Sequence, residues 1–403
     1  MGEKRNKIRE RDIQGLKYLD LLLPMLGGLH DVGCERDRAG NRKLHYDEYC
    51  LLVLLFLFNP IVRSLRGLQQ ASQLKNVQKK LGCPRTSLGS LSEATDVFDP
   101  LRLEAIIEEL LGQVPASSSV GRGQVQQALT AVDGSVVKTL SSLASAAYLR
   151  DKNGKPHAGW RFHTHFDIDR RVPMRMDVTS ALNSGKTDEK QHLREHLQPD
   201  HCYVMDRWFA EFALWNEIVA QGSSYVCRIR DNSNLSQIVE DRSLTDEARQ
   251  AKVLQDLVVN LGSGTQKPDH PVRVILVQAA PHKKTGGRKG GTAGPPSDGI
   301  LRIATNLLDV PAEVLADIYR HRWTIELFFR FFKHVLGCRH LLSTDPVGIQ
   351  IQAYAAIIAC LLIALWTGGK PTLRTYEMVC YYLMGWADLK ELTAHLKKLQ
   401  PTC

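Results

Sequence analysis

The chain has 403 residues, of which 43% are hydrophobic and 24% are charged, as in an ordinary folded protein. This composition excludes a disordered chain, a collagen and a coiled-coil rod, and the length predicts two or three domains whose cores need no disulfides. Lysine and arginine number 52 against 43 for aspartate and glutamate, which gives a net charge of +9. Such an excess indicates a polyanionic partner, with nucleic acid ahead of a membrane surface.

Cysteine usage and the apolar runs bear on where the protein works. The nine cysteines are dispersed, without a C-x-x-C pair, which is not typical of a secreted disulfide framework or a zinc ribbon. The N-terminus MGEKRNKIRERD lacks the apolar core of an export signal. The apolar runs Cys50–Phe58 and Ala353–Trp366 are shorter than the roughly 20 residues that span a bilayer. We therefore expect a soluble, cytoplasmic protein with no membrane partner.

Residues 1–125 are predicted to be helical. Apolar residues recur at helical spacing in Leu16–Leu29 and Asp47–Phe58, and Pro60 ends the second helix. The segment SLRGLQQASQLKNVQKKLG combines an apolar stripe with lysines, and the capping-box spacing from Ser90 to Glu93 predicts a further helix start. Short helices that carry basic residues favour a small DNA-binding region. The alternative is a helical bundle with a solvated lysine face.

From residue 126 the hydrophobic period changes to that of strands. Ala128–Lys138 is an apolar run interrupted by Asp133, and Trp160–Ile168 and Val172–Thr179 form two strands joined by a tight turn. The elements that follow are a helix at Thr187–Leu197, a strand at Cys202–Asp206, a helix at Trp208–Ala220 and a strand at Ser224–Arg230. This order predicts an α/β fold in which helices cover a mixed sheet.

Residues 231–310 differ from the preceding region in their sequence pattern and are predicted to form a β-rich insertion. Strand-like runs occupy Val253–Leu261, Pro271–Gln278 and Leu301–Leu307. Between the last two runs lies a loop rich in glycine, proline and lysine, His282–Gly299. Its cations are candidates for DNA contact, with a solvated surface loop as the alternative; they are Lys283, Lys284, Arg288 and Lys289.

The most informative stretch is a predicted helix that runs from Pro311 to about Gly337. At 100° per residue, a 60° arc of this helix holds four polar side chains, Tyr319, Arg322, Glu326 and Lys333, beside a thick apolar face. A charged helix face is usually solvated. Here the apolar residues surround most of the helix, so its charges need partners or a metal. The tail, residues 346–403, is predicted to add two or three helices.

Two aspartates are placed where such partners should lie. Asp133 is the lone charge inside an apolar strand, and Asp206 ends the strand CYVMD just before a helix. Together with Glu326 they offer an oxygen-ligand site suited to Mg²⁺. Two such ions about 3.5–4 Å apart can activate water and stabilise the leaving oxygen at a phosphodiester. Other possible ligands have more ordinary explanations: His163 and His165, which alternate with Asp167 on one strand, are better explained as satisfied or DNA-facing histidines, and Asp177 and Asp188 as turn or cap residues.

Asp133 in AVDGS, Asp206 in YVMDRW and the Tyr319-x2-Arg322-x3-Glu326-x6-Lys333 helix resemble the DDE insertion-sequence transposases with the Y-R-E-K signature. The resemblance covers about residues 125–340. It implies a ribonuclease-H-like catalytic domain formed by residues 126–230 and 311–345, which the insertion 231–310 interrupts. Regions 1–125 and 346–403 would then be the helical DNA-binding region and a C-terminal helical region.

The resemblance also implies roles for individual residues. Asp133, Asp206 and Glu326 would ligate two Mg²⁺ ions, for which Mn²⁺ could substitute, and DNA would be cleaved through a hairpin at the transposon ends. Tyr319, Arg322 and Lys333 would hold the phosphate beside the scissile bond. Trp208 would stack on a flipped base, unless it is a core residue at the start of its helix. Arg330 would add a further DNA contact.

The expected partners are the terminal inverted repeats of the transposon, target DNA and, in the DNA-bound complex, a second copy of the chain. The expected location is the prokaryotic nucleoid. Two alternatives stay open at this point. One is a DNA-binding protein that keeps the fold without catalysis, and the other is a simple metal-dependent nuclease, which has no need of paired DNA ends.

Overall fold

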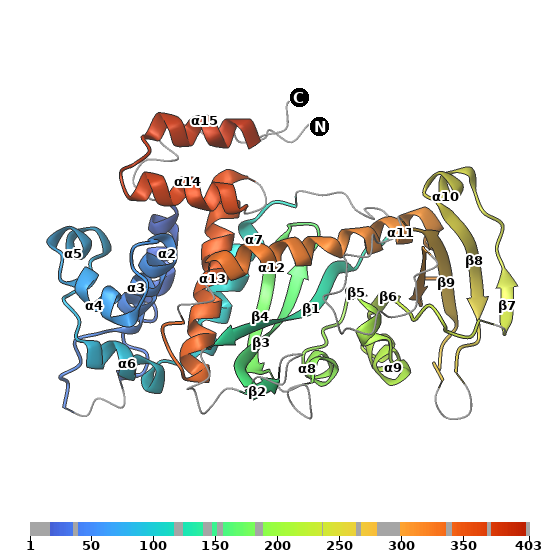
Figure 1. Ribbon diagram of the computed structural model, residues 1–403, viewed down its shortest axis with the longest axis horizontal. Helices are drawn as coiled ribbons and strands as arrows, with labels where there is room; N and C mark the ends of the chain where they lie inside the picture. Colours follow the sequence, from blue (N-terminus) through green and yellow to red (C-terminus); the bar gives the residue numbers. More distant parts are fainter. Residues whose placement is uncertain are drawn as a thin grey trace.

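The computed structural model describes residues 17–34, 39–116, 124–139, 147–150, 156–181, 188–235, 237–262, 267–279, 299–335, 341–368 and 372–399. Helices of the N-terminal region lie at one end of the molecule, the strands run through its middle, and the last strands form the other end (Figure 1). The long helix α13 stands between the N-terminal helices and the strands (Figure 1).

The described strands form one mixed sheet. At its centre, β1 (Ala128–Thr139) pairs antiparallel with β3 (Pro156–Asp167) and parallel with β5 (His201–Met205). β3 also pairs with β4 (Val172–Ser180), and β5 pairs in parallel with β6 (Ser224–Arg228). This is the expected order of three strands, helix, strand, helix, strand, and the predicted α/β fold with a large mixed sheet and flanking helices is confirmed. A short strand that the sequence did not indicate, β2 (Ala147–Arg150), pairs with the start of β3.

Helices cover both faces of the sheet because side chains alternate along each strand. On one face, the rings of Phe162 and Phe166 in β3 lie 5.4 Å from those of Phe332 and Phe328 in α12 (Trp323–Val335). On the other face, residues of β1, β5 and β6 pack against α8 (Glu189–Glu195) and α9 (Phe212–Ala220). The strand β1 therefore lies buried between two helical layers.

The sequence between β6 and α11 continues the same sheet. The strand β10 (Ile300–Thr305) pairs with β6 on one side and with β9 (Val272–Gln278) on the other, and β8 (Val253–Val259) and β7 (Ile238–Asp241) follow outward. A short helix, α10 (Asp246–Gln250), precedes β8. The region is β-rich, as expected, and it is hydrogen-bonded through β10 to the central strands of the sheet. The domain limits drawn from the sequence stay predictions.

The N-terminal region is helical as predicted. Asp47–Phe58 corresponds to α3, and the lysine-containing segment forms two short helices, α4 and α5. The helix start expected at Ser90 is wrong: α6 begins at Leu88, because Ser87 caps it by accepting a hydrogen bond from the Ser90 backbone N–H. The helices of this region are α2 (Lys17–Gly27), α3 (Tyr46–Phe58), α4 (Leu65–Ser72), α5 (Lys75–Leu81), α6 (Leu88–Val97), η2 (Pro100–Leu103) and α7 (Glu104–Gln113).

The tail supplies three helices, α13 (Pro346–Thr367), α14 (Leu373–Leu383) and α15 (Leu389–Leu399). α13 is long and apolar enough to cross a membrane, but 89% of its most apolar stretch is buried inside the protein. It packs against β4, α7 and α3, so its apolar surface belongs to the core shared by the sheet and the N-terminal helices.

Two predicted helices are divided in the structure. The single helix expected from Pro311 to about Gly337 is two helices, α11 (Ala312–His321) and α12, which meet at Arg322; residues 336–340 lie outside the described residues. The helix expected at Trp208–Ala220 is a short 3-10 turn, η4 (Arg207–Phe209), followed by α9. Asp206 caps this turn by accepting a hydrogen bond from the Trp208 backbone N–H, which leaves the Trp208 side chain outside α9.

Candidate active site

Asp133 lies in the middle of β1, directly opposite Thr164 of β3. Its carboxylate accepts a hydrogen bond of 2.8 Å from the Gly134 backbone N–H. Burial, together with the negative charge of nearby Asp206, raises the pKa of Asp133 to about 7. The raised pKa means that the charged form of Asp133 is destabilised here, and a nearby cation would stabilise that form.

Asp206 follows the last residue of β5, the strand parallel to β1. Parallel neighbours end at the same edge of a sheet, which brings Asp206 near Asp133. The side chain of Asp206 accepts a hydrogen bond of 2.8 Å from the Trp208 backbone N–H, and this bond fixes the turn that leaves the strand. The two aspartates therefore belong to one group of negative charges on adjacent strands.

Glu326 lies in the first turn of α12, the helix packed across this half of the sheet. The Arg322 guanidinium donates a hydrogen bond of 2.6 Å to Glu326 and lies 4.0 Å from the Asp133 carboxylate. Arg322 thus joins the helix carboxylate to the strand carboxylate. Burial alone would lower the pKa of Arg322, but Tyr319 and the two carboxylates raise it.

Tyr319 is 8% exposed, and its ring lies 5.8 Å from the Arg322 guanidinium carbon, within cation–π distance. Burial raises the pKa of the Tyr319 phenol to about 12, so the hydroxyl keeps its proton as a hydrogen-bond donor. The three residues Tyr319, Arg322 and Glu326 lie together even though the helix is interrupted at Arg322.

The residues present fit divalent cations, with one rearrangement. Asp133, Asp206 and Glu326 offer hard oxygen ligands that are partly exposed, with side-chain exposures of 23% for Asp133 and 30% for Glu326. Within the described part of the chain, these three carboxylates are not among the groups whose ligand atoms all lie within 4.8 Å of one another. Arg322 takes the place of a cation between Asp133 and Glu326, so a metal ion that bridges them requires its guanidinium to turn away.

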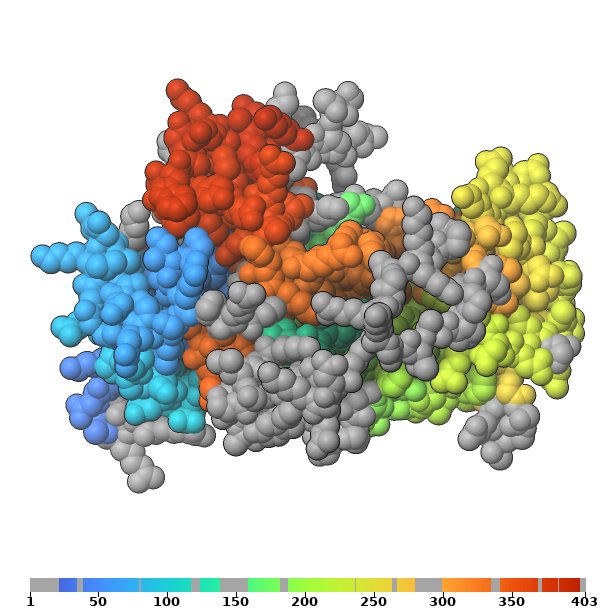
Figure 2. Space-filling model, viewed as in Figure 1, coloured from blue at the N-terminus to red at the C-terminus, as the bar shows by residue number. Residues whose placement is uncertain are grey.

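The face that carries α11 and α12 is open in part. Figure 2 shows these helices crossing the middle of the molecule with part of β1 visible beside them. The other expected DNA contacts are two residues of α12 and four cations of the loop. Lys333 is half-buried nearly two turns after Glu326, and Arg330 is exposed with its guanidinium 5.7 Å from the Trp323 ring. The loop cations Lys283, Lys284, Arg288 and Lys289 lie outside the described residues.

Trp208 is 49% exposed, so the reading of this residue as a core tryptophan is wrong. The Lys190 ammonium lies 5.4 Å from its ring centre. An exposed indole beside the Asp206 turn, with a cation over one face, is a surface on which a base can stack.

His163 of β3 is a satisfied buried residue. His163 lies 2.8 Å from the Thr179 hydroxyl and stacks on His192 at 4.2 Å, and burial lowers the pKa of His163 to about 3. Asp177, His192 and His196 place ligand atoms within 4.8 Å of one another. However, Asp177 is bound by Arg175 at 2.6 Å, and the two imidazoles are stacked.

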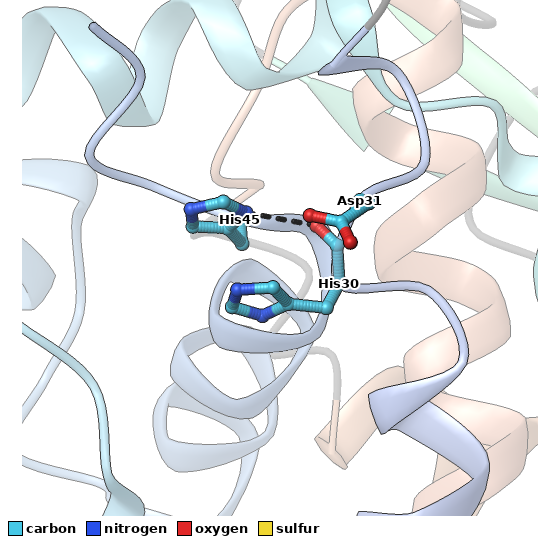
Figure 3. Close-up of side chains that lie close together, drawn as sticks. All are labelled: His30, Asp31 and His45. Atoms are coloured by element: carbon cyan, nitrogen blue, oxygen red, sulfur yellow. Dashed lines mark hydrogen bonds between the residues drawn. The ribbon is translucent and has the colours of Figure 1, made fainter. Parts of the chain in front are cut away.

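A second cluster lies in the N-terminal region, where His30, Asp31 and His45 come together (Figure 3). The two imidazoles are stacked with centres 3.8 Å apart and planes within 5°. Their Nδ1 atoms are engaged by the Asp47 carboxylate and by the His30 backbone carbonyl. Nitrogen lone pairs lie in the ring plane, so parallel stacked rings do not direct them at a shared ion. This arrangement therefore does not fit a metal site.

The sequence analysis missed one acidic residue beside Asp133. Glu189, at the start of α8, is 9% exposed and pairs with Arg161 of β3. Its carboxyl lies against Gly134, the residue after Asp133. The signal available in the sequence was the glycine that directly follows the strand aspartate.

Comparisons with known proteins identify the family to which this chain belongs. Residues 126–362, more than half of the chain, match the family described as Transposase DDE domain. A putative transposase, y4zB, from Sinorhizobium fredii is 26% identical over 208 residues, 51% of this chain and 53% of that protein. A probable transposase for insertion sequence element IS5377 from Geobacillus stearothermophilus is 26% identical over 207 residues, 51% of this chain and 49% of that protein. The matched regions thus span about half the length of these curated relatives. The cryo-EM structure of the piggyBac transposase synaptic complex with hairpin DNA aligns with a TM-score of 0.44 and 11% identity, over 99% of this chain and 84% of that one.

Proposed function

From the premise that this chain belongs to the Transposase DDE domain family, we propose that it is a transposase that cleaves DNA at transposon ends and joins those ends to target DNA. The observation that carries the proposal is the convergence of Asp133, Asp206 and Glu326 from two strands and a helix, with Arg322 between two of them. The spacing of Tyr319, Arg322, Glu326 and Lys333 supports membership of the group with the Y-R-E-K signature.

The three carboxylates would hold two Mg²⁺ ions, or Mn²⁺ in their place. Such ions supply a metal-activated water and charge stabilisation at the leaving oxygen. The chain's own contribution is to fix the ligands on rigid elements: Asp133 on a buried strand, Asp206 through its cap hydrogen bond and Glu326 on a packed helix.

The cationic strip of α11 and α12 would hold the DNA. With the carboxylates held by cations, Arg322 would be free for a bidentate phosphate contact, and Lys333 of α12 would add a point charge. Tyr319 keeps its phenolic proton for donation to a phosphate oxygen. Trp208, half exposed beside Asp206, would stack on a base that leaves the duplex, as a hairpin product requires.

The N-terminal helices would bind the transposon end away from the scissile bond. An open groove of about 940 Å³ lies in this region, and its lining includes Arg42, Lys43, Arg85, Gln69 and Ser87. Cations together with amide and hydroxyl groups are what phosphate and base edges require. Two copies of the chain would pair two ends, and the prokaryotic nucleoid would be the place of action.

The decisive experiment is cleavage of a labelled duplex that carries the sequence flanking this gene, in the presence of Mg²⁺, by the wild-type protein and by Glu326→Gln. Glutamine keeps the size and removes the charge, so folding and DNA binding should persist while metal-dependent nicking and hairpin products disappear. Binding without cleavage by the wild-type protein would indicate the DNA-binding alternative. Cleavage retained by Glu326→Gln would contradict the assignment of Glu326.

Two further measurements separate the remaining alternatives. A simple metal-dependent nuclease would cut without pairing ends, whereas a transposase joins a labelled end to target DNA and does so as a dimer on two ends. DNA affinity should also fall with salt, with a log–log slope of about −0.9 per phosphate neutralised. A salt-independent affinity would contradict DNA binding through lysine and arginine.

A further inference from the structure

We propose that Glu189 is a fourth carboxylate of the metal site, which exchanges its partner Arg161 for a divalent cation held with Asp133 and Asp206. The inference rests on the proposed function, because it adds a ligand to the same cation site. It concerns a residue on α8, on the sheet face opposite to the α12 face that carries Glu326.

The first argument is the fit of Glu189 to Gly134. A Cβ atom built on Gly134 would overlap with Oε1 and the carboxyl carbon of Glu189. Gly134 does not have a left-handed backbone, so its conformation does not require glycine. The strand lacks a side chain at this position because the Glu189 carboxyl fills the space, one residue from Asp133.

The second argument is electrostatic. Glu189 is 9% exposed, and a buried carboxylate needs a cation. The negative charges of Asp206 and Asp133 lie close enough to Glu189 to interact with it. The three acidic groups thus repel one another, and Arg161 alone compensates the charge of Glu189 among the ion pairs of the described residues. Divalent cations would relieve this repulsion.

The third argument is a pair of polar atoms left without partners. Glu189 and Asp133 line a small cavity to which Thr164 also contributes. Thr164 is 1% exposed, and its hydroxyl has no hydrogen-bond partner among the described residues. The Nε atom of Arg161 is likewise buried and without a partner in the described chain. Unsatisfied buried groups of this kind are expensive in a finished core and point to a ligand or water that completes the site.

The competing explanation is a purely structural ion pair between Glu189 and Arg161. The two explanations predict opposite changes in metal affinity when Arg161 is replaced. If Glu189 is a ligand, Arg161 competes with the cation, so removing Arg161 tightens metal binding while removing the Glu189 charge weakens it. If the pair is only structural, the two substitutions act alike, since each leaves the other member buried and unpaired.

The experiment is Mn²⁺ titration of the full-length protein at pH 7.5 without DNA, with free Mn²⁺ followed by electron paramagnetic resonance. Glu189→Gln should weaken binding about 10-fold or more, the size of effect known for groups around metal ligands. Arg161→Met should bind Mn²⁺ at least as tightly as the wild type. Glu195→Gln, on the exposed side of the same helix, is the matched control and should leave binding unchanged. Asp133→Asn tests the proposed metal site itself.

Each result either supports or overturns the inference. Weaker binding in Glu189→Gln combined with unchanged or tighter binding in Arg161→Met supports the inference. Equal weakening in both variants, or no change in Glu189→Gln while Asp133→Asn loses Mn²⁺, overturns it and leaves the proposed function intact. A wild-type protein that binds no Mn²⁺ overturns both. Should Glu189→Gln fail to fold, the double variant Arg161→Met/Glu189→Gln removes both charges, and the inference then requires weaker binding than in Arg161→Met alone.

Discussion

Arg322 donates a 2.6 Å hydrogen bond to Glu326 one helical turn further on, while its other terminal nitrogen lies 4.0 Å from Asp133. One guanidinium therefore balances two carboxylates from different elements. Its Nε atom is buried and has no hydrogen-bond partner among the described residues, so this contact leaves part of the guanidinium unsatisfied. A divalent cation can therefore displace Arg322 from the two carboxylates.

We expect Arg322→Gln to bind Mn²⁺ several-fold more tightly than the wild type in the absence of DNA, because a competing positive charge is removed. The same variant should bind end DNA less tightly, since a phosphate contact is lost. Isothermal titration calorimetry measures both. Arg320→Gln removes an exposed cation two residues earlier and is the control. Weaker Mn²⁺ binding in Arg322→Gln would show that the guanidinium supports the site instead of competing for it.

The buried histidines predict how stability depends on pH. Burial lowers the pKa of His165 to about 3, so between pH 6.5 and pH 3 the unfolded chain binds a proton at this residue that the folded protein does not. The contribution of His165 to the free energy of unfolding is therefore fully present above pH 6.5 and is lost as the pH falls. Replacing His165 with leucine should reduce the slope of unfolding free energy in this range by about 1.4 kcal/mol per pH unit. Urea unfolding at pH 7.5, 6.0 and 5.0 tests this, and an unchanged slope would contradict it.

Gly134→Ala should destabilise the protein by about 1–3 kcal/mol, because the new methyl group overlaps with the buried Glu189 carboxyl. In a Glu189→Ala background the space is free, so the same substitution should cost much less. A double-mutant cycle in urea measures the coupling between the two positions. Additive effects would mean that the contact between Gly134 and Glu189 does not matter energetically.

A buried ion pair anchors the strands beyond β6. Arg273 in β9 contacts Asp256 in β8 at 2.6 Å and donates to backbone carbonyls of the segment before α11, among them Leu308 at 3.0 Å. Asp256→Ala leaves the Arg273 charge buried and should cost about 3–5 kcal/mol of unfolding free energy. Asp256→Leu combined with Arg273→Met should recover much of that loss. Guanidinium unfolding of both variants is the measurement, and a loss below about 1 kcal/mol in Asp256→Ala would contradict the prediction.

Much of this molecule could be predicted from its sequence. The central strands follow directly from apolar runs with clear turns, and Asp133 and Asp206 are conspicuous because they interrupt or end such runs. The break at Arg322 could not be predicted, because the helical spacing of the apolar residues continues across it. The side-chain contacts of Trp208 also depend on a cap that only the fold reveals.

Glu189 was missed for a different reason. An acidic residue at the start of a helix has a sufficient local explanation in the helix dipole. The glycine after Asp133 is a signal that this position needs space, but the sequence does not say that Glu189 fills it. The pairing of β10 with β6 likewise could not be predicted, because a strand-like sequence does not indicate which strand it pairs with.

The position of α13 in the core also constrains how the chain acquires its structure during synthesis. The helix packs against α3, which is made at the beginning of the chain, and against β4, which is made in the middle. Translation at about 5–20 residues per second leaves roughly a quarter of a minute to a minute between the completion of α3 and that of α13. For that interval the part of the α3 apolar surface that α13 covers in the finished protein stays uncovered. We therefore expect the nascent protein to depend on chaperones until nearly all of it has been translated, and a ribosome stalled before Pro346 to hold an N-terminal region open to proteolysis.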